Sequence, residues 1–381
     1  MARYGGKLRD FTAQELAAVA SKEAIKRSGV DPKEFDHAVF GNAQQTSGDS
    51  IYGARHVALK AGLPIEVPAL TVNRLCGSGM QSIVSAAQLI QLGEAKTVLA
   101  GGMEAMSQAP HVIRGARWGF GLGEGKMEDS LMVALLDTYC GLYMAQTAEE
   151  YGNQQGITRE QMDEFSLRSQ KLAAEAQQAC RLGEEITPVP LLNRKGQPTG
   201  ELFEKDDHLR PETTLEGLAK LKPAFGKNVT AGNASGIVDG GAAVVLTSLE
   251  DAEKRNLKPL GRIVSWGIAG VDPRIMGSGP VPATRSALKR AGMKLEDIDL
   301  IEVNEAFAAQ YLAVEKELGL DRSKVNVNGG AIALGHPLGA TGTRLVLTLL
   351  YELRRRKKKY GLATACIGGG QGIAVIVESF N

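Results

Sequence analysis

An internal repeat constrains the fold of this chain more than any other feature. The segment AIKRSGVDPKEFDHAVFGNA, residues 24–43, aligns without gaps with ALKRAGMKLEDIDLIEVNEA, residues 287–306. Each copy has the pattern of an amphipathic helix end, a glycine stop, a short acidic connection and a buried strand. A chain that carries this unit twice is predicted to form two related α/β halves, each with a sheet flanked by helices.

The repeat continues along the chain. Residues 69–107 and 325–372 both show a short strand, a glycine-rich turn, a long helix and a second apolar strand. We therefore predict an N-terminal half at residues 1–110 and a C-terminal half at residues 236–381. Residues 111–235 change character, with a glycine-rich stretch, a polar helical stretch and a loop-like stretch, and are interpreted as a functional insertion.

The two halves differ at their beginnings. Residues 259–277 provide a strand before the first helix of the second half, whereas the first half starts almost at its helix, within residues 5–29. The repeat thus predicts that the first sheet lacks its N-terminal strand. The alternative is that another segment of the chain occupies that position.

Composition narrows the classes of function. The 381 residues include 44 basic and 43 acidic side chains, which gives no electrostatic basis for binding nucleic acid or an acidic membrane. The basic run at residues 353–360 is interpreted as a solvated helix end. No apolar run reaches the roughly 18 residues of a membrane span, so we expect a soluble protein of the cytoplasm, or of an organelle matrix in a eukaryote.

Four cysteines lie far apart, at positions 76, 140, 180 and 366. Their spacing predicts neither a disulfide framework nor a metal site, and their scarcity fits a reducing compartment. Cys140 and Cys180 are interpreted as bystanders.

Cys76 is the first candidate for chemistry. In VNRLCGSGMQS, residues 72–82, it follows an apolar run and precedes a helical pattern, so its thiol is expected at a helix N-terminus. There the helix dipole would favour the thiolate and lower a pKa that is normally near ~8.5. An inert buried cysteine is the alternative.

His336 lies in the matching turn of the second half, GGAIALGHPLGATG, residues 329–342. It is a candidate acceptor for the Cys76 proton, holding the thiolate as an ion pair. A structural histidine is the alternative.

Two further motifs follow strands of the second half. CIGGGQG, residues 366–372, combines a thiol with glycines whose N–H groups could form an oxyanion hole, or only a hairpin turn. In VNEAFAAQ, residues 303–310, Asn304 closes a buried strand and needs a hydrogen-bond partner, unless the pair with Glu305 is a helix cap. All four motifs follow strands, where open α/β sheets bind ligands, and together they indicate acyl transfer through a thioester.

These motifs resemble the thiolase family, and the resemblance covers nearly the whole chain. The matching stretches also include GGMEAMSQAP, residues 101–110, and TAGNASGIVDGGAA, residues 230–243. The resemblance implies two duplicated α/β halves in a five-layered αβαβα core, with an inserted loop domain for coenzyme A binding and oligomer contacts. It also implies a homodimer or homotetramer.

The resemblance implies a reversible, two-step acyl transfer. Cys76 matches the nucleophile that carries the acyl group, and Cys366 matches the acid and base for the α-carbon of acetyl-CoA. His336 matches the residue that activates Cys76 and, with a water held by Asn304, stabilises the enolate oxygen. The N–H groups of Cys76 and Gly368 match the hole for the tetrahedral intermediate.

Coenzyme A and acetyl-CoA are implied as substrates, with no tightly bound cofactor and no metal. Arg210 and Thr213 match contacts to the nucleotide end of coenzyme A, and Ser235 matches a contact to the pantetheine. Met144 and Met276 match apolar walls near the acyl group.

Two departures from the family pattern bear on these expectations. The usual first strand, ending in RTP, is missing, in agreement with the gap that the repeat exposes. Tyr143 also stands where short-chain acetoacetyl-CoA thiolases have histidine. We therefore expect an acetyl-CoA C-acyltransferase that accepts a range of acyl chains. The alternatives are a short-chain acetyl-CoA C-acetyltransferase and a non-catalytic acyl-CoA or lipid-binding protein of this family.

Overall fold

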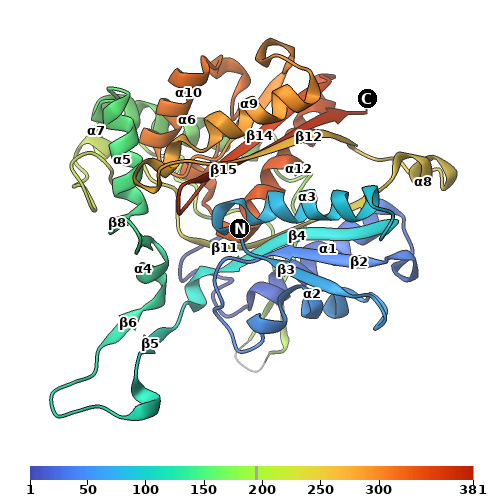
Figure 1. The fold of residues 1–381 in the computed structure, drawn as a ribbon, viewed down its shortest axis with the longest axis horizontal. Coiled ribbons are helices and arrows are strands. Elements are labelled where there is room, and N and C mark those ends of the chain that lie inside the picture. Colours follow the sequence, from blue (N-terminus) through green and yellow to red (C-terminus); the bar gives the residue numbers. More distant parts are fainter. Residues whose placement is uncertain (194–195, 381) are drawn as a thin grey trace.

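Two mixed β-sheets form the framework of the computed structural model, which describes residues 1–193 and 196–380. The first sheet has the order β1-β11-β4-β2-β3 and the second the order β12-β15-β14-β13 (Figure 1). The strands of the first sheet are β1 (Ala2–Arg3), β2 (His37–Gly41), β3 (Ala69–Val72), β4 (Thr97–Ala105) and β11 (Val238–Thr247). Those of the second are β12 (Gly261–Gly270), β13 (Leu300–Val303), β14 (Tyr360–Ile367) and β15 (Gln371–Ser379).

The two sheets share one topology, as the repeat predicts. In the first, β2 is parallel to β4, which pairs antiparallel with β11. In the second, β13 is parallel to β14, which pairs antiparallel with β15. Strands β2, β4 and β11 therefore correspond to β13, β14 and β15.

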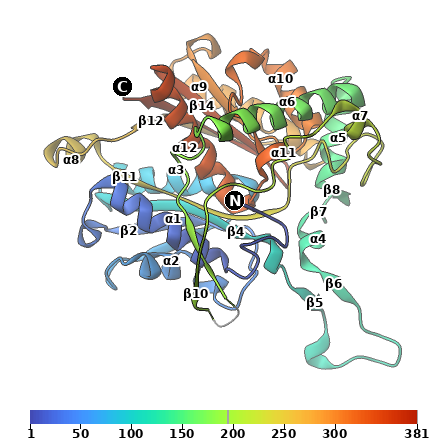
Figure 2. The ribbon, with the colours of Figure 1, turned by 180° about the vertical axis from the view of Figure 1, so that it is seen from behind.

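Helices separate and cover the sheets, giving the five layers of the predicted αβαβα core (Figures 1 and 2). Between the sheets lie α3 (Ser78–Gln91) and α12 (Leu338–Arg356), each packed on strands and on the other. The outer face of the first sheet is covered by α1 (Ala13–Ser28) and α2 (Gly53–Ala61). On the outer side of the second sheet lie α9 (Pro280–Ala291) and α10 (Ala308–Leu318).

Small residues let the central helices touch. A side-chain carbon on Gly79 of α3 would lie 2.6 Å from the backbone nitrogen of Thr343 in α12, and one on Gly342 would collide with the backbone of Met80. The Thr343 hydroxyl donates a hydrogen bond to the Gly79 carbonyl at 3.0 Å. Because these contacts lie in the first turn of α3 and the second turn of α12, the N-terminal ends of the two helices lie side by side.

The inserted region interrupts the first half between β4 and β11. Its helices are α4 (Ser130–Ala134), α5 (Met144–Gln154), α6 (Arg159–Gln178) and α7 (Leu215–Ala219). Its strands form three hairpins, β5 (His111–Ile113) with β6 (Met127–Asp129), β7 (Leu136–Asp137) with β8 (Leu142–Tyr143), and β9 (Val189–Leu192) with β10 (Pro198–Phe203). The hairpin of β5 and β6 forms an arm that projects from the body (Figure 1).

Two expectations for this region need correction. The stretch expected to be loop-like contains β9 and β10, because Leu191 and Phe203 are buried against Leu8 and Leu16. The boundary predicted at residue 236 is also wrong by one strand, since β11 belongs to the first sheet. Motif order along the chain does not reveal which sheet a strand joins.

The remaining helices are short and connect the main elements. They are α8 (Leu249–Lys254), α11 (Ala331–Leu334), η1 (Pro32–Glu34), η2 (Ser50–Tyr52), η3 (Leu75–Gly77), η4 (Met106–Gln108), η5 (Ala116–Trp118), η6 (Pro273–Ser278), η7 (Leu295–Asp297) and η8 (Arg322–Lys324). Within the residues that the structure describes, no helix is long and apolar enough to cross a membrane.

The open edge of the first sheet lies where the repeat predicts a missing strand. In the second sheet, β12 pairs along nearly all of β15. On the corresponding edge of β11, the described residues provide only Ala2 and Arg3, which pair with Asp239 and Val238. The rest of this edge lines a cavity of about 480 Å³.

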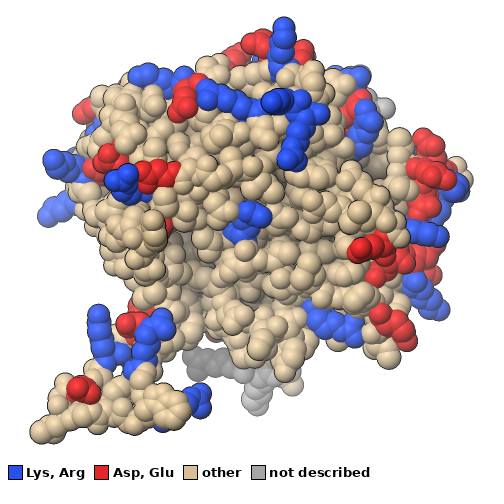
Figure 3. Space-filling view, in the orientation of Figure 1, with Lys and Arg blue, Asp and Glu red and all other residues tan. Residues whose placement is uncertain are grey.

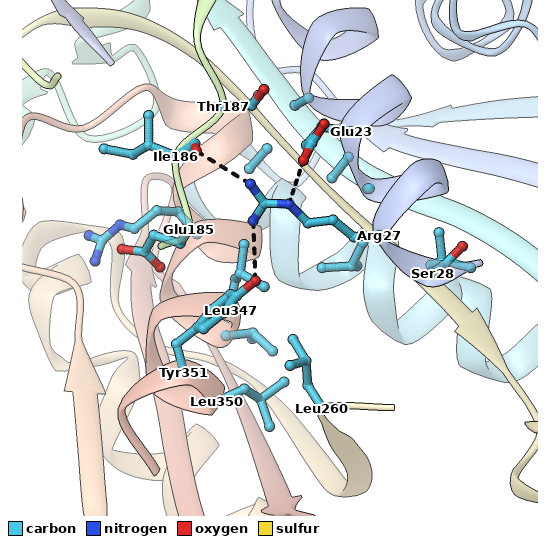
Figure 4. A pocket seen from close by; sticks show the side chains of 18 of the residues that line it. Glu23, Arg27, Ser28, Glu185, Ile186, Thr187, Leu260, Leu347, Leu350 and Tyr351 are labelled. Carbon is cyan, nitrogen blue, oxygen red and sulfur yellow. Dashed lines mark hydrogen bonds and ion pairs between the residues drawn. The ribbon is translucent and has the colours of Figure 1, made fainter. Parts of the chain in front are cut away.

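Side chains from both halves border this cavity (Figure 4). Arg27 of α1 donates hydrogen bonds to Glu23, to the Tyr351 hydroxyl of α12 and to the Ile186 carbonyl. The cavity therefore lies between α1, α12 and the edge of β11.

We predict that a strand placed ahead of Met1 stabilises the protein. Because β1 is antiparallel to β11, such residues would run along the edge from Gly240 toward Thr247. Fusing about seven strand-forming residues there should raise Tm by about 5 °C or more, measured by circular dichroism. A control segment with proline at alternate positions cannot donate to the ladder. Equal shifts from both segments would contradict the prediction.

Candidate active site

Cys76 lies in a tight turn between β3 and α3. Leu75, just before it, has φ of 45°, a left-handed conformation that costs a branched residue free energy. Hydrogen bonds hold this conformation: Leu75 N–H donates to Asn73 Oδ1 at 2.9 Å, and the Ser78 hydroxyl donates to the Leu75 carbonyl at 2.7 Å. The predicted strand, turn and helix are all present, and the turn presents the thiol at the N-terminus of α3.

The expected lowering of the Cys76 pKa is wrong. Burial raises the pKa of the Cys76 thiol to about 11, and a hydrogen bond from the Gly368 N–H offsets this only in part. The negative charge of Glu104 raises it further. Desolvation of the thiolate therefore outweighs the favourable helix terminus, and Cys76 rests as a neutral thiol that needs a base.

His336 is held with one ring nitrogen available as a base. Thr341 donates its hydroxyl hydrogen to the Pro337 carbonyl at 3.0 Å, which leaves its oxygen to accept a hydrogen bond from His336 Nδ1–H at 2.6 Å. This arrangement leaves the lone pair on Nε2. The Asn304 amide nitrogen lies 3.3 Å from Nε2.

The charge state of His336 also differs from expectation. Burial, followed by the positive charge of Arg344, lowers the pKa of His336 to about 3. The imidazole is therefore neutral at rest, and so is the Cys76 thiol, which differs from the thiolate–imidazolium ion pair expected from the sequence.

Cys366 is the penultimate residue of β14, just before the hairpin turn into β15. It is buried, and its pKa is raised above the ordinary thiol value, first by desolvation and then by its proximity to Cys76, since two thiolates at one site would repel each other. A side-chain carbon on Gly77 would lie 2.5 Å from the Ile367 side chain, so the two cysteine-bearing turns are in contact. Cys366 is also close enough to Cys76 for an electrostatic interaction, so this contact brings the two thiols to one site.

Asn304 follows β13 and is completely buried. Its N–H donates to the Thr364 carbonyl at 2.9 Å, and its Oδ1 has no hydrogen-bond partner within residues 1–193 and 196–380. Glu305 does not cap α10, which begins only at Ala308; it accepts hydrogen bonds from Ser169, from Asn326 and from the Ile332 N–H in the first turn of α11. Asn304 is thus the member of the pair that faces His336.

Apolar side chains surround Cys366. Met276 belongs to the same buried cluster, and Met144 packs against it. The Met144 sulfur would lie 3.1 Å from a side-chain carbon on Gly368, which places it beside the hairpin turn. Ser235 lies next to this cluster, since its N–H donates to the Ala306 carbonyl at 2.9 Å.

The structure does not bring Arg210 and Thr213 to the cysteines. Arg210 is exposed, its N–H donates to Gln170 at 2.9 Å, and the Thr213 hydroxyl donates to the Arg210 carbonyl at 2.7 Å. Its guanidinium forms no ion pair in the part of the chain that the structure describes. The pair belongs to an exposed loop of the inserted region.

Two residues of the site were not predicted from the sequence, Thr341 and Glu104. Thr341 lies in the same glycine-rich stretch as His336. A hydroxyl five residues after the histidine could have been recognised from the sequence as a possible hydrogen-bond partner of its ring. Glu104 is a carboxylate in a strand whose nine residues are all buried, so it required partners that the sequence does not identify. The described residues contain no group of three or more His, Cys, Asp or Glu side chains placed to hold a metal ion.

Comparison with known proteins places this geometry in one family. The thiolase N-terminal domain matches residues 1–250 and the thiolase C-terminal domain matches residues 257–379. The mitochondrial 3-ketoacyl-CoA thiolase of Homo sapiens is 53% identical, over 99% of this chain and 95% of its own. An acetyl-CoA acetyltransferase of Cupriavidus necator is 50% identical, over 99% of this chain and 96% of its own.

Solved structures agree with these relatives. Human mitochondrial 3-ketoacyl-CoA thiolase in complex with CoA superimposes with a TM-score of 0.96 at 52% identity, over 100% of this chain and 95% of that one. The Bacillus anthracis acetyl-CoA acetyltransferase also superimposes with a TM-score of 0.96, at 48% identity, over 100% of this chain and 96% of that one. The chain therefore belongs to the thiolase family, whose members named here are acyltransferases.

Proposed function

We propose that this protein is an acetyl-CoA C-acyltransferase that cleaves 3-ketoacyl-CoA with coenzyme A, and forms it in reverse, through an acyl group on Cys76. The observation that carries the proposal is the contact between the two cysteine-bearing turns, which places Cys366 close enough to Cys76 for the two thiols to interact electrostatically. A nucleophile and a separate acid or base at one site suit a reaction in two steps.

In the first step of cleavage, the Cys76 sulfur attacks the 3-keto carbon while its proton passes to His336 Nε2. The bond between carbons 2 and 3 breaks, the acyl group stays on Cys76, and the acetyl-CoA carbanion takes a proton from Cys366. In the second step, coenzyme A gives its thiol proton to Cys366, and its sulfur takes the acyl group from Cys76. His336 returns its proton to the departing Cys76 sulfur, so every group ends as it began.

The neutral resting states of Cys76 and His336 suit this order of reaction steps. Because the pKa of Cys76 is about 11 and that of His336 about 3, the proton moves only as the carbon–sulfur bond forms. The N–H groups of Cys76 and Gly368 are proposed to bind the tetrahedral oxyanion. Asn304, with its unpartnered Oδ1, is proposed to hold a water that binds the enolate oxygen with His336.

Coenzyme A is proposed to lie across the inserted region. Arg210 and Thr213 would contact its nucleotide end and Ser235 its pantetheine, with Met144 and Met276 beside the acyl chain. The exposed Arg210 guanidinium suits an anionic phosphate ligand. The human relative was solved in complex with CoA, which supports coenzyme A as a substrate. We propose no tightly bound cofactor.

A broad acyl range is favoured over acetoacetyl-CoA alone. Tyr143, directly before Met144, stacks on Phe225 with ring centroids 4.5 Å apart, giving the wall an aromatic face. Five mitochondrial 3-ketoacyl-CoA thiolases are 50–53% identical, and acetyl-CoA acetyltransferases are 49–50% identical. The acetyl-CoA C-acetyltransferase remains the second candidate. The full set of catalytic side chains argues against a non-catalytic binding protein.

We propose a homodimer or homotetramer. The arm formed by β5 and β6 extends clear of the body (Figure 3) and exposes Trp118 and Leu122. The edge strand β3, directly before the Cys76 turn, exposes Leu70. Apolar surface of this kind suits contact with another subunit. The cytoplasm is proposed as the compartment, or an organelle matrix in a eukaryote, which the mitochondrial relatives support.

The proposed function is tested with purified protein, coenzyme A and 3-ketoacyl-CoA substrates of increasing chain length. We expect cleavage of acetoacetyl-CoA and of longer 3-ketoacyl-CoA chains. Cleavage is measured as the loss of the absorbance of the substrate's enolate. Cleavage of acetoacetyl-CoA alone would favour the second candidate. Absence of turnover with every chain would contradict the proposal.

Replacing each cysteine should separate the two steps. Cys76→Ala should lower kcat by about a thousandfold or more, because it removes the acyl carrier. Cys366→Ala should lower it similarly yet keep part of the acyl exchange between acetyl-CoA and labelled coenzyme A, because coenzyme A can leave and return as its thiolate without a proton from Cys366. Cys180→Ala, at an exposed cysteine, is the matched control and should keep the wild-type rate. Acyl exchange that survives in Cys76→Ala would refute the assignment of the nucleophile.

Thr341→Val should impair the base without unfolding the protein. The variant removes the oxygen that accepts the hydrogen bond from His336 Nδ1–H, so the ring proton is no longer confined to Nδ1. Because Nε2 then does not always carry the lone pair, kcat should fall about 100-fold. Nitrogen NMR of labelled histidine should show a change of tautomer. Thr348→Val is the control. Thr348 lies two turns further along α12, and its hydroxyl donates a hydrogen bond to Glu185. An unchanged tautomer with unchanged kcat would contradict the role of Thr341.

A further inference from the structure

A buried carboxylate lies between the Cys76 and His336 turns. Glu104, near the end of β4, is completely buried. Its Oε1 accepts hydrogen bonds from the Asn42 amide at 2.9 Å and the Gln44 N–H at 3.0 Å. Its Oε2 accepts from the Ala43 N–H at 3.1 Å and the Gly339 N–H at 2.8 Å.

One side of this carboxylate leads to Cys76. The Ala43 carbonyl accepts a hydrogen bond from the Asn73 amide at 3.1 Å, and Asn73 Oδ1 in turn accepts from the Leu75 N–H. Leu75 is the left-handed residue directly before Cys76. Glu104 is thus connected to the strained position of the nucleophile turn by one intervening side chain.

The other side leads to His336. Gly339 lies in the first turn of α12, three residues after His336, and packs on β4 so closely that a side-chain carbon would collide with the Met103 carbonyl. The bond from Gly339 N–H therefore joins a strand of the first half to the histidine turn of the second half.

The chemistry of these contacts requires a carboxylate. All four partners are donors, and an ionised carboxylate has only acceptors. A glutamine at this position would turn an amide NH₂ group toward two N–H donors, whichever way it faced. The described residues place no Lys or Arg in an ion pair with Glu104, and its charge acts on the Cys76 thiol.

We propose that Glu104 is a positioning residue for the reaction proposed above. It fixes the Cys76 turn against the His336 turn, and its charge keeps Cys76 protonated until a substrate carbonyl is present. Burial raises the pKa of Glu104 to about 7, offset in part by its four hydrogen bonds, and its negative charge opposes formation of the Cys76 thiolate. Position and charge therefore make separate, measurable contributions.

The test measures the alkylation rate of Cys76 by iodoacetamide against pH, using mass spectrometry of the Cys76 peptide, together with kcat. Glu104→Gln removes the charge, so Cys76 should be alkylated about threefold faster or more at pH 8. Its kcat should nevertheless fall about tenfold or more, because the two turns are no longer joined. Because local unfolding would also expose a buried thiol and lower turnover, the increase must be specific to Cys76: the peptide that contains the buried Cys366, measured in the same digest, should be alkylated no faster than in the wild type.

Two further variants separate the contributions. Glu104→Asp keeps the charge but shortens the side chain, so kcat should fall while the alkylation profile stays near that of the wild type. Glu149→Gln is the matched control, since this buried carboxylate also accepts hydrogen bonds from backbone N–H groups, those of Lys227, Asn228 and Val229. It should leave the alkylation profile of Cys76 unchanged.

The proposal is overturned if Glu104→Gln leaves both the alkylation profile and kcat at wild-type values, or if Glu149→Gln shifts the profile equally. If Glu104→Gln does not fold, Glu104→Asp decides, and unchanged kcat in that variant overturns the proposal. The alkylation measurement needs no acyl-CoA. Failure of the proposed function would appear as inactive wild-type protein, while the alkylation shift would still report on Glu104.

Discussion

The close contact between the N-termini of α3 and α12 is the constraint on which the active site depends. Gly79 and Gly342 let the two helices touch, and the Thr343 hydroxyl fastens them at the Gly79 carbonyl. Each helix follows a turn from a different half of the chain, one with Cys76 and the other with His336. Duplication of one α/β unit therefore creates the site, because neither half contains both Cys76 and His336.

Desolvation determines how this site holds its protons. A helix N-terminus alone would favour a thiolate, but burial and the charge of Glu104 keep Cys76 neutral, and burial with Arg344 keeps His336 neutral. The site thus rests without separated charge between these two groups. Charge develops only when a carbonyl carbon is in place, where donors such as Gly368 N–H can bind the resulting oxyanion.

Much of the fold was predictable from the sequence. The internal repeat predicts two halves of related topology, and the glycine-rich motifs predict the turns between strands and helices. Cys76, His336, Cys366 and Asn304 follow from those motifs. The sheet that contains β11 does not, since strand pairing across an insertion leaves no local signal. The pKa of Cys76 and the roles of Thr341 and Glu104 were also beyond reach, because each depends on contacts between residues distant in sequence or on burial.

The central claim is that Cys76 alone carries the acyl group. Its most direct test is mass spectrometry of the protein after brief incubation with a 3-ketoacyl-CoA in the absence of free coenzyme A, followed by acid quenching and peptide mapping. Our account predicts the mass of the acyl group on the peptide that contains Cys76, with the Cys366 peptide unmodified. An acyl group on Cys366, or turnover without any acylated cysteine, would contradict it.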